Sequence, residues 1–291
     1  TIGNFVISNE HGEKIGIRDD FKILTPDEAK IVLNKYFSIN PNYCHRYIDT
    51  IGKIKDFGIG IEEYEKYLYR QMNIFGGEGE FEKKFHDLQF ELQILNEEAD
   101  KNKRKEFSKK LNHLNNLREL KKFILSWKAY EKIKQKNNFL DYSDLNINII
   151  KLLEKSPEIA DDYDYFIVDE FQDTNKVQLD FIFRICRNRN ITIGGDLNQS
   201  IYRFRGAFKD NFQSFKDFFN VGKDDIFALD KSYRSSNKIL SAAHSLMLNN
   251  YENKDDCFEV RNFDGRDGDN IDVYEMKNAK EEARKVAELV E

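Results

Sequence analysis

The stretch Phe166-Ile-Val-Asp-Glu-Phe-Gln-Asp-Thr174 decides the fold, because it joins an apolar run directly to two adjacent carboxylates. The run Tyr165–Val168 is short and apolar, which predicts a buried strand of a parallel sheet. Asp169 and Glu170 follow where this strand ends. Neighbouring side chains at a strand end point in different directions, so one carboxylate can hold a hydrated Mg²⁺ while the other faces an attacking water. Acidic pairs at strand ends are common, so a structural role is the alternative.

Two further polar segments follow expected strands in the same way. Gly195-Asp-Leu-Asn-Gln-Ser-Ile-Tyr-Arg-Phe-Arg-Gly-Ala207 comes directly after the run Ile191–Ile193. Leu229-Asp-Lys-Ser-Tyr-Arg-Ser-Ser236 follows the run Ile226–Leu229. The carboxyl ends of parallel strands meet at one edge of a sheet, so this edge should carry carboxylates, a Gln, an Arg and several aromatics. Such a set suits a nucleotide phosphate on one side and nucleic-acid bases on the other.

The second half of the chain alternates strand and helix signals, which is typical of an α/β protein with a parallel sheet. The expected helices are 177–185, 208–219, 237–248 and 279–291, and 271–274 is a further expected strand. Ser235 or Ser236 is expected to cap the third of these helices. The stretch 262–270 is polar and rich in turn residues, so we interpret it as a link.

Residues 81–127 carry two apolar stripes at helical spacing. We predict two long antiparallel helices, with a coiled-coil pair as the alternative. Residues 99–138 contain 13 Lys/Arg and 4 Asp/Glu, a local charge of +9 in a chain whose net charge is −6. A basic helical arm of this kind can follow a phosphate backbone, and a solvated lysine face is the alternative.

Composition excludes several classes of protein. Forty per cent hydrophobic residues are enough to build a core, and the mild acidity argues against a uniformly basic nucleic-acid coat. No window approaches ~18 uninterrupted apolar residues, so we expect no membrane association. Cys44, Cys186 and Cys257 are isolated, and the five His show no metal spacing. These features predict a reducing, cytoplasmic setting without a disulfide framework or a zinc site.

The segments VDEFQDT, GDLNQSIYRFRGA and LDKSYRSS resemble motifs II, III and IV of superfamily 1 DNA helicases of the UvrD/Rep/PcrA type. Residues 138–145 resemble the D-F-x-D-L segment before motif II, in which Asp141 and Asp144 are expected to cap a helix or to pack. Residues 1–5 resemble the T-F-H-S-F segment, with Gly3 where the family has His. The resemblance implies an α/β fold, in which a RecA-like parallel-sheet domain carries a helical insertion and a second RecA-like domain begins.

This resemblance also implies domain boundaries and residue roles in a family that uses ATP and Mg²⁺. The implied domains are the first RecA-like domain (1–30 and 139–222), the helical insertion (31–138) and the start of the second RecA-like domain (223–291). The implied catalytic residues are Glu170 as the base that deprotonates water, Gln199 as the γ-phosphate sensor and Arg234 as a second γ-phosphate contact. The implied cofactor-binding residues are Asp169 as the Mg²⁺ ligand, Gln172, Asp173, and Tyr233 stacking on adenine. For Arg234, a structural salt bridge is the alternative.

A third set of residues is implied to face single-stranded DNA. These residues are Tyr202, Phe204 and Arg205, with Phe204 where the family usually has Trp. Stacking of a base on an aromatic ring is worth roughly 1–3 kcal/mol, and Phe offers less area for it than Trp. From composition alone, a core position is the better explanation of Tyr202 and Phe204, and the motif context reverses this in favour of a functional role.

A family ATPase also needs the phosphate-binding loop G-x-x-x-x-G-K-[ST], which the 291 residues do not contain. In the family this loop precedes the T-F-H-S-F segment, and motifs V and VI follow motif IV. We therefore expect a middle piece of an ATP-dependent 3′-to-5′ DNA helicase that acts on single strands and duplex junctions. Such a piece needs the P-loop segment of the same protein and should not hydrolyse ATP alone. The alternatives are the helicase part of a helicase–nuclease, with a repair or nuclease partner, and a non-catalytic DNA-binding scaffold.

Overall fold

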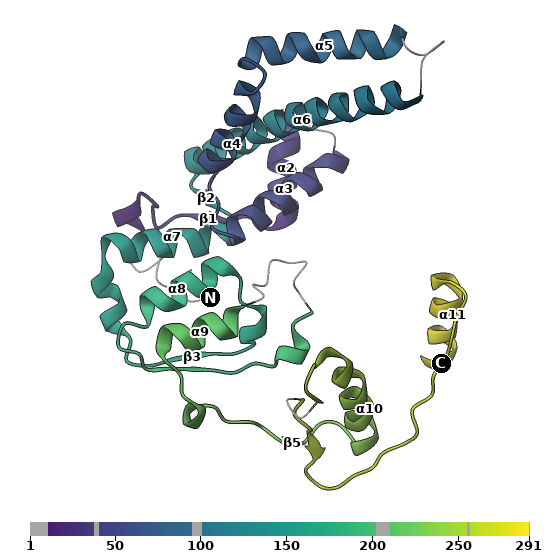
Figure 1. The fold of residues 1–291 in the computed structure, drawn as a ribbon. Coiled ribbons are helices and arrows are strands. Elements are labelled where there is room, and N and C mark those ends of the chain that lie inside the picture. The colour runs from purple at the N-terminus through teal and green to yellow at the C-terminus, as the bar shows by residue number, and fades with distance from the viewer. Residues whose placement is uncertain (1–10, 38–40, 95–100, 202–209, 255–256, 291) are drawn as a thin grey trace. The chain divides into compact units, whose positions relative to one another are not determined.

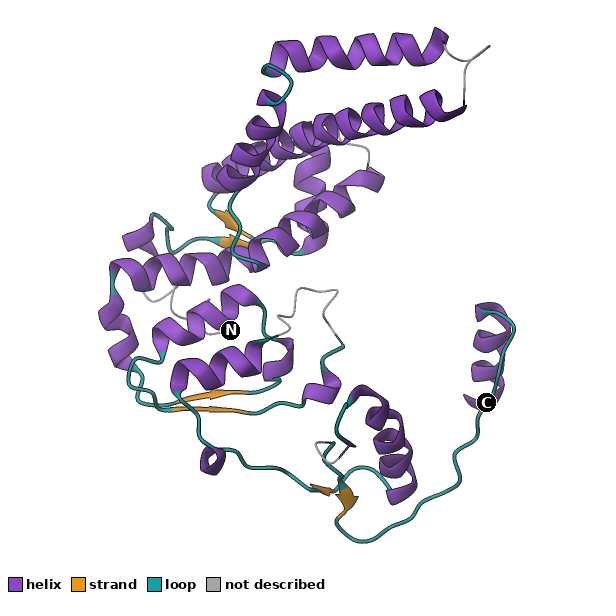
Figure 2. Ribbon diagram, viewed as in Figure 1, coloured by secondary structure: helices purple, strands orange, loops and turns teal. Residues whose placement is uncertain are grey.

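The computed structural model describes residues 11–37, 41–94, 101–201, 210–254 and 257–290 (Figure 1). The chain divides into two compact units, Thr1–Asn220 and Val221–Glu291. Helices make up most of the regular structure, and the strands are short (Figure 2). Among the described helices, none combines the length and the apolar character that crossing a membrane requires.

A run of helices builds the first part of the first unit. These helices are α2 (Pro26–Phe37), α3 (Pro41–Asp56), α4 (Ile61–Asn73), α5 (Glu78–Ile94) and α6 (Lys101–Asn137). The 37-residue α6 packs against α2, α3, α4 and α5. Their apolar faces meet in one core, in which Phe81, Trp127 and Tyr130 are fully enclosed. The prediction of two long helices in this region is confirmed, and α6 continues past Trp127 to Asn137.

Helices α5 and α6 run alongside each other (Figure 1). Their contact combines an apolar stripe with pairs of opposite charge. Arg118 on α6 pairs with Glu82 at 3.3 Å, and its guanidinium lies 4.3 Å from the centre of the Phe85 ring. Lys121 pairs with Glu78 one turn further along. Such partly exposed ion pairs contribute at most about 1 kcal/mol each, so the buried stripe supplies most of the stability of this arm.

The strands of the first unit are parallel. β1 (Lys22–Ile23) pairs with β2 (Phe139–Leu140), and β3 (Phe166–Val168) pairs with β4 (Ile191–Ile193). Helices α2–α6 lie in the chain between β1 and β2, so this strand pair closes off the helical insertion. The remaining helices of the unit are α7 (Tyr142–Lys155), α8 (Lys176–Ile185) and α9 (Asn211–Phe219). Expected strands and helices in this part are confirmed, with bounds that differ by a few residues. The expectation that β3 is buried is wrong: Ile167 is 75% exposed, because the described residues add no third strand to the β3–β4 pair.

The second unit contains β5 (Lys231–Ser232), α10 (Asn237–Met247), β6 (Arg261–Asn262) and α11 (Ala279–Val290). β5 and β6 are parallel neighbours. Both helices were expected from the sequence. Ser236 occupies the N-cap position of α10, but its side chain makes no capping hydrogen bond.

Two strands expected in this unit, 226–229 and 271–274, are wrong, because both segments are irregular in the structure. Their apolar side chains remain on the surface, with Phe227 85% exposed, Leu229 87% and Val273 90%. An apolar run becomes a strand only where a neighbouring strand completes its hydrogen-bond ladder. The described residues supply no such neighbour to either segment.

The fold class is therefore confirmed in its coarse form. The strand pairs are parallel and are connected through helices, as an α/β protein requires. Each sheet of the described residues has only two strands, however, and helices predominate.

Candidate functional site

The chain turns sharply where β3 ends, and this turn presents Asp169 and Glu170 at the surface. Glu170 has φ 51° and ψ 41°, a left-handed conformation that residues other than glycine rarely adopt. Behind it the chain enters the single turn of 3-10 helix Phe171–Asp173. A strained backbone of this kind costs roughly 1–3 kcal/mol and persists only where its surroundings hold it in place.

Phe171 holds the turn in place. Its side chain is fully buried and meets the rings of Phe212 and Phe215 edge-on, at centroid distances of 5.1 and 5.3 Å. Its backbone is also fixed on both sides: its N–H donates to the carbonyl of Gly194 (2.9 Å), and its carbonyl accepts from Asn211 Nδ2 (2.7 Å). The start of α9 and the end of β4 therefore lock the turn that carries the two carboxylates.

Gln172 joins this turn to the loop after β4. Its Nε2 donates to Glu170 Oε2 at 2.6 Å, and its Oε1 accepts from the backbone N–H of Asp196 at 3.0 Å. Gly195 makes this approach possible, because a Cβ there would lie 2.6 Å from Gln172 Oε1 and 2.9 Å from the Phe212 ring. The buried Gln172 thus connects motif II with motif III through both ends of its amide.

Gln199 belongs to the same chain of hydrogen bonds. Its Nε2 donates to Asp196 Oδ2 at 2.9 Å, while Asp196 Oδ1 accepts from the N–H of Asn198. Asp196 therefore contacts Gln172 through its backbone and Gln199 through its side chain. Sequence reasoning missed Asp196, although its place at the end of the Ile191–Ile193 run was a usable signal.

The chemistry of the carboxylates at this turn fits a bound Mg²⁺. Mg²⁺ in nucleotide sites usually takes one or two protein carboxylates and fills its remaining positions with water and phosphate oxygens. Asp169 is exposed, and its Oδ1 accepts the N–H of Glu170 at 2.9 Å. Oδ1 of Asp173 is buried without any hydrogen-bond partner. Asp169 could hold the ion, and the orphan oxygen of Asp173 is a second acceptor on the same turn.

Motif IV lies in the second unit, where β5 leads to Tyr233 and Arg234 at the surface. The backbone N–H groups of Arg234 and Ser235 donate to Ser232 Oγ, at 3.3 and 3.1 Å. Within the described part of the chain, the Arg234 guanidinium forms no salt bridge. The aromatic ring and the cation are both accessible to a ligand.

The three residues expected to face single-stranded DNA, Tyr202, Phe204 and Arg205, lie outside the described residues. The segment 1–5, with Gly3, lies outside them as well.

A buried ion cluster lies at the base of the helical insertion. Lys55 of α3 and Lys134 of α6 are both buried, and they bind three carboxylates: Glu131, Asp141 and Asp144. Lys55 Nζ lies 2.6 Å from Glu131 and 2.7 Å from Asp144, and Lys134 Nζ lies 2.7 Å from Asp141. Burial acts to raise the pKa of Asp141, but the two ammonium groups hold it below its ordinary value. The cluster joins two insertion helices to the start of α7.

Asp141 and Asp144 also cap α7, as expected from the sequence. Asp144 N donates to Asp141 Oδ1 (2.9 Å), and Asp141 N donates to Asp144 Oδ2 (2.8 Å), which forms a reciprocal capping box. Their lysine partners were missed. The i, i+3 spacing of Glu131 and Lys134 was the only signal in the sequence, because Lys55 is distant along the chain.

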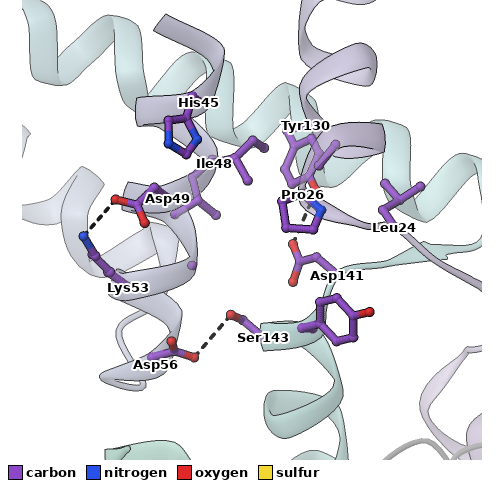
Figure 3. A pocket seen from close by; sticks show the side chains of 14 residues that line it. Leu24, Pro26, His45, Ile48, Asp49, Lys53, Asp56, Tyr130, Asp141 and Ser143 are labelled. Atoms are coloured by element: carbon purple, nitrogen blue, oxygen red, sulfur yellow. Dashed lines mark hydrogen bonds and ion pairs between the residues drawn. The ribbon is translucent and has the colours of Figure 1, made fainter. Parts of the chain in front are cut away.

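A pocket of ≈ 410 Å³ lies beside the cluster, where Leu24 and Asp141 follow the ends of β1 and β2 (Figure 3). Asp56 and Ser143 approach each other in it, with Ser143 Oγ donating to Asp56 Oδ1 at 3.2 Å. Burial raises the pKa of Asp56 to about 6, and the charge of Asp141 adds to this effect. The pocket therefore contains a carboxyl group whose pKa lies well above the ordinary value of an aspartate.

Two carboxylates lie on a fixed turn after a parallel strand, and an amide ties this turn to the loop after the next strand, which is the edge where α/β proteins bind nucleotides. Comparison with known families agrees. Residues 2–220 match the model of the UvrD/REP helicase N-terminal domain, and residues 227–291 match that of the UvrD-like helicase C-terminal domain. The chain therefore belongs to the UvrD/REP family of helicases.

Curated relatives carry helicase names. The ATP-dependent DNA helicase PcrA of Staphylococcus epidermidis is 29% identical over 273 residues, which cover 92% of this chain and 36% of the relative. PcrA of Bacillus subtilis is 38% identical over 142 residues, or 47% of this chain and 19% of the relative. A probable DNA helicase II homologue of Mycoplasma genitalium is 38% identical over 125 residues, or 41% and 18%. The chain thus spans about a third or less of the length of these relatives.

Proposed function

We propose that this chain is a segment of a cytoplasmic, ATP-dependent DNA helicase and carries part of its nucleotide-hydrolysing site. One observation supports this proposal above the others: a continuous hydrogen-bonded path runs from Glu170 through Gln172 and Asp196 to Gln199. The path links a carboxylate able to accept a proton with an amide able to contact a phosphate. The intact protein would couple Mg-ATP hydrolysis to 3′-to-5′ movement on single-stranded DNA and to unwinding at duplex junctions.

Each proposed role uses the chemistry of its side chain. Asp169 would hold Mg²⁺, which neutralises charge on the phosphates, and Asp173 would support that ligand. Glu170 would accept a proton from the attacking water, in an orientation fixed by Gln172. Gln199 would donate its amide to the γ-phosphate. Asp169 and Glu170 would act from a turn held by the buried Phe171 and Gln172, and Gln199 would act from a hydrogen bond to Asp196.

The second unit would supply two further groups that contact ATP. Tyr233 offers an exposed ring on which adenine can stack, and Arg234 offers a cation for the γ-phosphate. Arginine contacts of this kind are worth roughly 10³–10⁵ in rate. Both side chains are exposed, so each is accessible to a nucleotide.

DNA contacts would come from two places. We propose that Tyr202, Phe204 and Arg205 contact single-stranded DNA. Helix α6 presents exposed lysines, among them Lys105, Lys109, Lys132 and Lys136. Lysines along one helix can follow phosphates without reading sequence, so this arm would bind in a salt-dependent way.

We also propose the domain division and the inactivity of the segment alone. The first RecA-like domain would comprise 1–30 and 139–222, the insertion 31–138, and the second domain would begin at 223. The 291 residues contain no G-x-x-x-x-G-K-[ST] loop, whose amides and lysine cradle the phosphates. The purified chain should therefore show no DNA-stimulated release of phosphate from ATP, and measurable turnover would contradict this part of the proposal.

The central experiment changes Glu170 to Gln in the full-length helicase. This change keeps shape and hydrogen bonding but removes the basic carboxylate, so ATP turnover should fall by about 10²–10⁴-fold. Equilibrium binding of MgATP should stay within a few-fold of the parent. Glu158→Gln, at an exposed glutamate paired only loosely with Lys14 (3.5 Å), is the matched control and should leave turnover unchanged. Near-normal turnover in Glu170→Gln would remove Glu170 from the role of base.

A further inference from the structure

The polar stretch after β6 folds back onto motif IV. β6 lies beside β5, with Arg261 N donating to the carbonyl of Asp230 (3.0 Å) and Phe263 N donating to that of Ser232 (2.9 Å). From the sequence this stretch was expected to be only a link. In the structure it forms one wall of the loop that presents Tyr233 and Arg234.

Asn262 is the centre of this wall. Its buried side chain donates through Nδ2 to the carbonyl of Ser235 (3.0 Å), and its Oδ1 accepts the N–H groups of Asp264 (3.0 Å) and Arg266 (2.9 Å). Arg266 in turn donates to the carbonyl of Arg234 at 3.0 Å. The backbone carbonyls of Arg234 and Ser235 are therefore held by side chains of the 262–266 segment.

Gly268 lets the two segments approach this closely. It has φ +78°, and a Cβ there would lie 2.3 Å from Ser236 Oγ and 2.5 Å from Ser236 Cβ. Only glycine permits both this backbone conformation and this contact.

The Phe263 side chain, next to Asn262 in this wall, contacts the ring of Tyr233. The two rings are stacked, with centroids 4.5 Å apart and planes inclined by 29°. Lys231 Nζ lies 5.7 Å from the centre of the Phe263 ring. Tyr233 nevertheless remains 72% exposed. One face of Tyr233 is therefore supported by Phe263, while much of its surface stays accessible.

We propose that Phe263 is a positioning residue for nucleotide binding, which holds the Tyr233 ring so that the purine base of ATP stacks on its free face. This inference rests on the proposed function, because it assumes that Tyr233 receives the base. An unsupported exposed tyrosine samples several rotamers and must lose that freedom when a base binds. The Phe263 ring removes part of this cost in advance, so it acts on affinity for the base and not on the chemical step.

Steady-state kinetics of the full-length helicase test this proposal. Aromatic pairing of this strength corresponds to a roughly two- to tenfold change in an equilibrium constant. Phe263→Ala should therefore raise KM for ATP about two- to tenfold and leave kcat within about twofold. Phe263→Leu, which keeps apolar volume but no ring, should behave like Phe263→Ala, and Phe263→Tyr should restore the parent KM. Inhibition by inorganic tripolyphosphate, which has no base, should be unchanged in all three variants.

Two controls separate positioning from folding and from the proposed function. Phe258→Ala removes another half-exposed phenylalanine of the same unit and should leave KM unchanged. Tyr233→Ala should raise KM at least as much as Phe263→Ala. If Tyr233→Ala raises KM and Phe263→Ala leaves it unchanged, the role of Phe263 alone is overturned. A parent KM in Phe263→Leu would also overturn it, because no ring would then be needed. Weaker inhibition by tripolyphosphate in the Phe263 variants would overturn it as well, because this inhibitor has no base. An unchanged KM in Tyr233→Ala overturns the inference through its premise, while Glu170→Gln still tests the hydrolytic site independently.

Discussion

Replacing Lys134 by Met should strongly destabilise the first unit. Lys134 is 2% exposed, and its ammonium lies 2.7 Å from Asp141 and 3.0 Å from Glu131. Methionine keeps a long flexible side chain but carries no charge. Among the described residues, Lys55 would then be the only cation paired with the three largely buried carboxylates.

The expected loss is large because the carboxylates stay buried. Removing one partner of a buried ion pair lowers the free energy of unfolding by about 3–5 kcal/mol. For a unit of this size, 1 kcal/mol corresponds to about 2–4 °C in Tm, so Tm should fall by about 6–20 °C. Lys122→Met is the matched control: Lys122 lies on the same helix, is 63% exposed and pairs with Glu119 at 2.7 Å. Its removal should cost less than about 1 kcal/mol.

The loss of unfolding free energy caused by Lys134→Met should become smaller as the pH falls. In the parent, the lysines hold the pKa of Asp141 below its ordinary value against the effect of burial. That contribution to stability is present above the unfolded pKa, about 4, and is lost as the pH drops through the folded pKa. In the variant, burial raises the pKa of a carboxylate that has lost a partner, so the folded state takes up a proton. Acidification from about pH 7 to about pH 4 should therefore favour the variant relative to the parent.

Urea unfolding followed by tryptophan fluorescence measures this effect directly. Trp127 is the only tryptophan of the chain, and its Nε1 donates to Glu131 Oε1 at 3.0 Å, so it reports on the cluster itself. Equal losses in Lys134→Met and Lys122→Met at pH 7 would refute the reasoning. A deficit that grows on acidification would refute it equally.

Two other changes follow from the same structure. Gly195→Ala places a Cβ 2.6 Å from Gln172 Oε1 and 2.9 Å from the Phe212 ring. The free energy of unfolding should therefore fall by about 1–3 kcal/mol, and ATP turnover of the full-length helicase should also fall. Asp56 has a pKa raised by burial to about 6, so its folded form binds the proton more tightly than the unfolded chain does. The free energy of unfolding should therefore decline as the pH rises from about 4 to about 6. Asp56→Asn can still accept the hydrogen bond from Ser143 and should flatten this part of the pH profile measured by urea unfolding. An unchanged slope in the variant would contradict the assignment to Asp56.

The local elements of the motif-bearing region could be predicted, because their signals lie within a few neighbouring residues. The run before Asp169 forms β3, the run before Gly194 forms β4, and the periodic segment after Asn175 forms α8. The apolar runs 226–229 and 271–274 carry an equally clear signal, yet neither is a strand. A strand depends on hydrogen bonds from a neighbour, and no short window of sequence shows whether that neighbour is present.

The candidate site divides in the same way. Asp169, Glu170, Gln172, Gln199, Tyr233 and Arg234 were all named from motifs, because residue type and order are properties of the sequence. The sequence did not show how these residues are connected. Asp196 joins Gln172 to Gln199, and Phe263 covers one face of Tyr233. Both contacts depend on which loops meet after the chain folds.

The sequence by itself determined the family, the order of the motifs and the strand-turn-helix elements that carry them. Only the tertiary structure decided that Lys55 and Lys134 bind three carboxylates at the base of the insertion, and that a polar link supports motif IV. The physical reason is the range of the forces involved. Periodicity and turn chemistry act between residues close in the chain, whereas ion pairs, ring stacking and close backbone contacts act between residues that folding brings together.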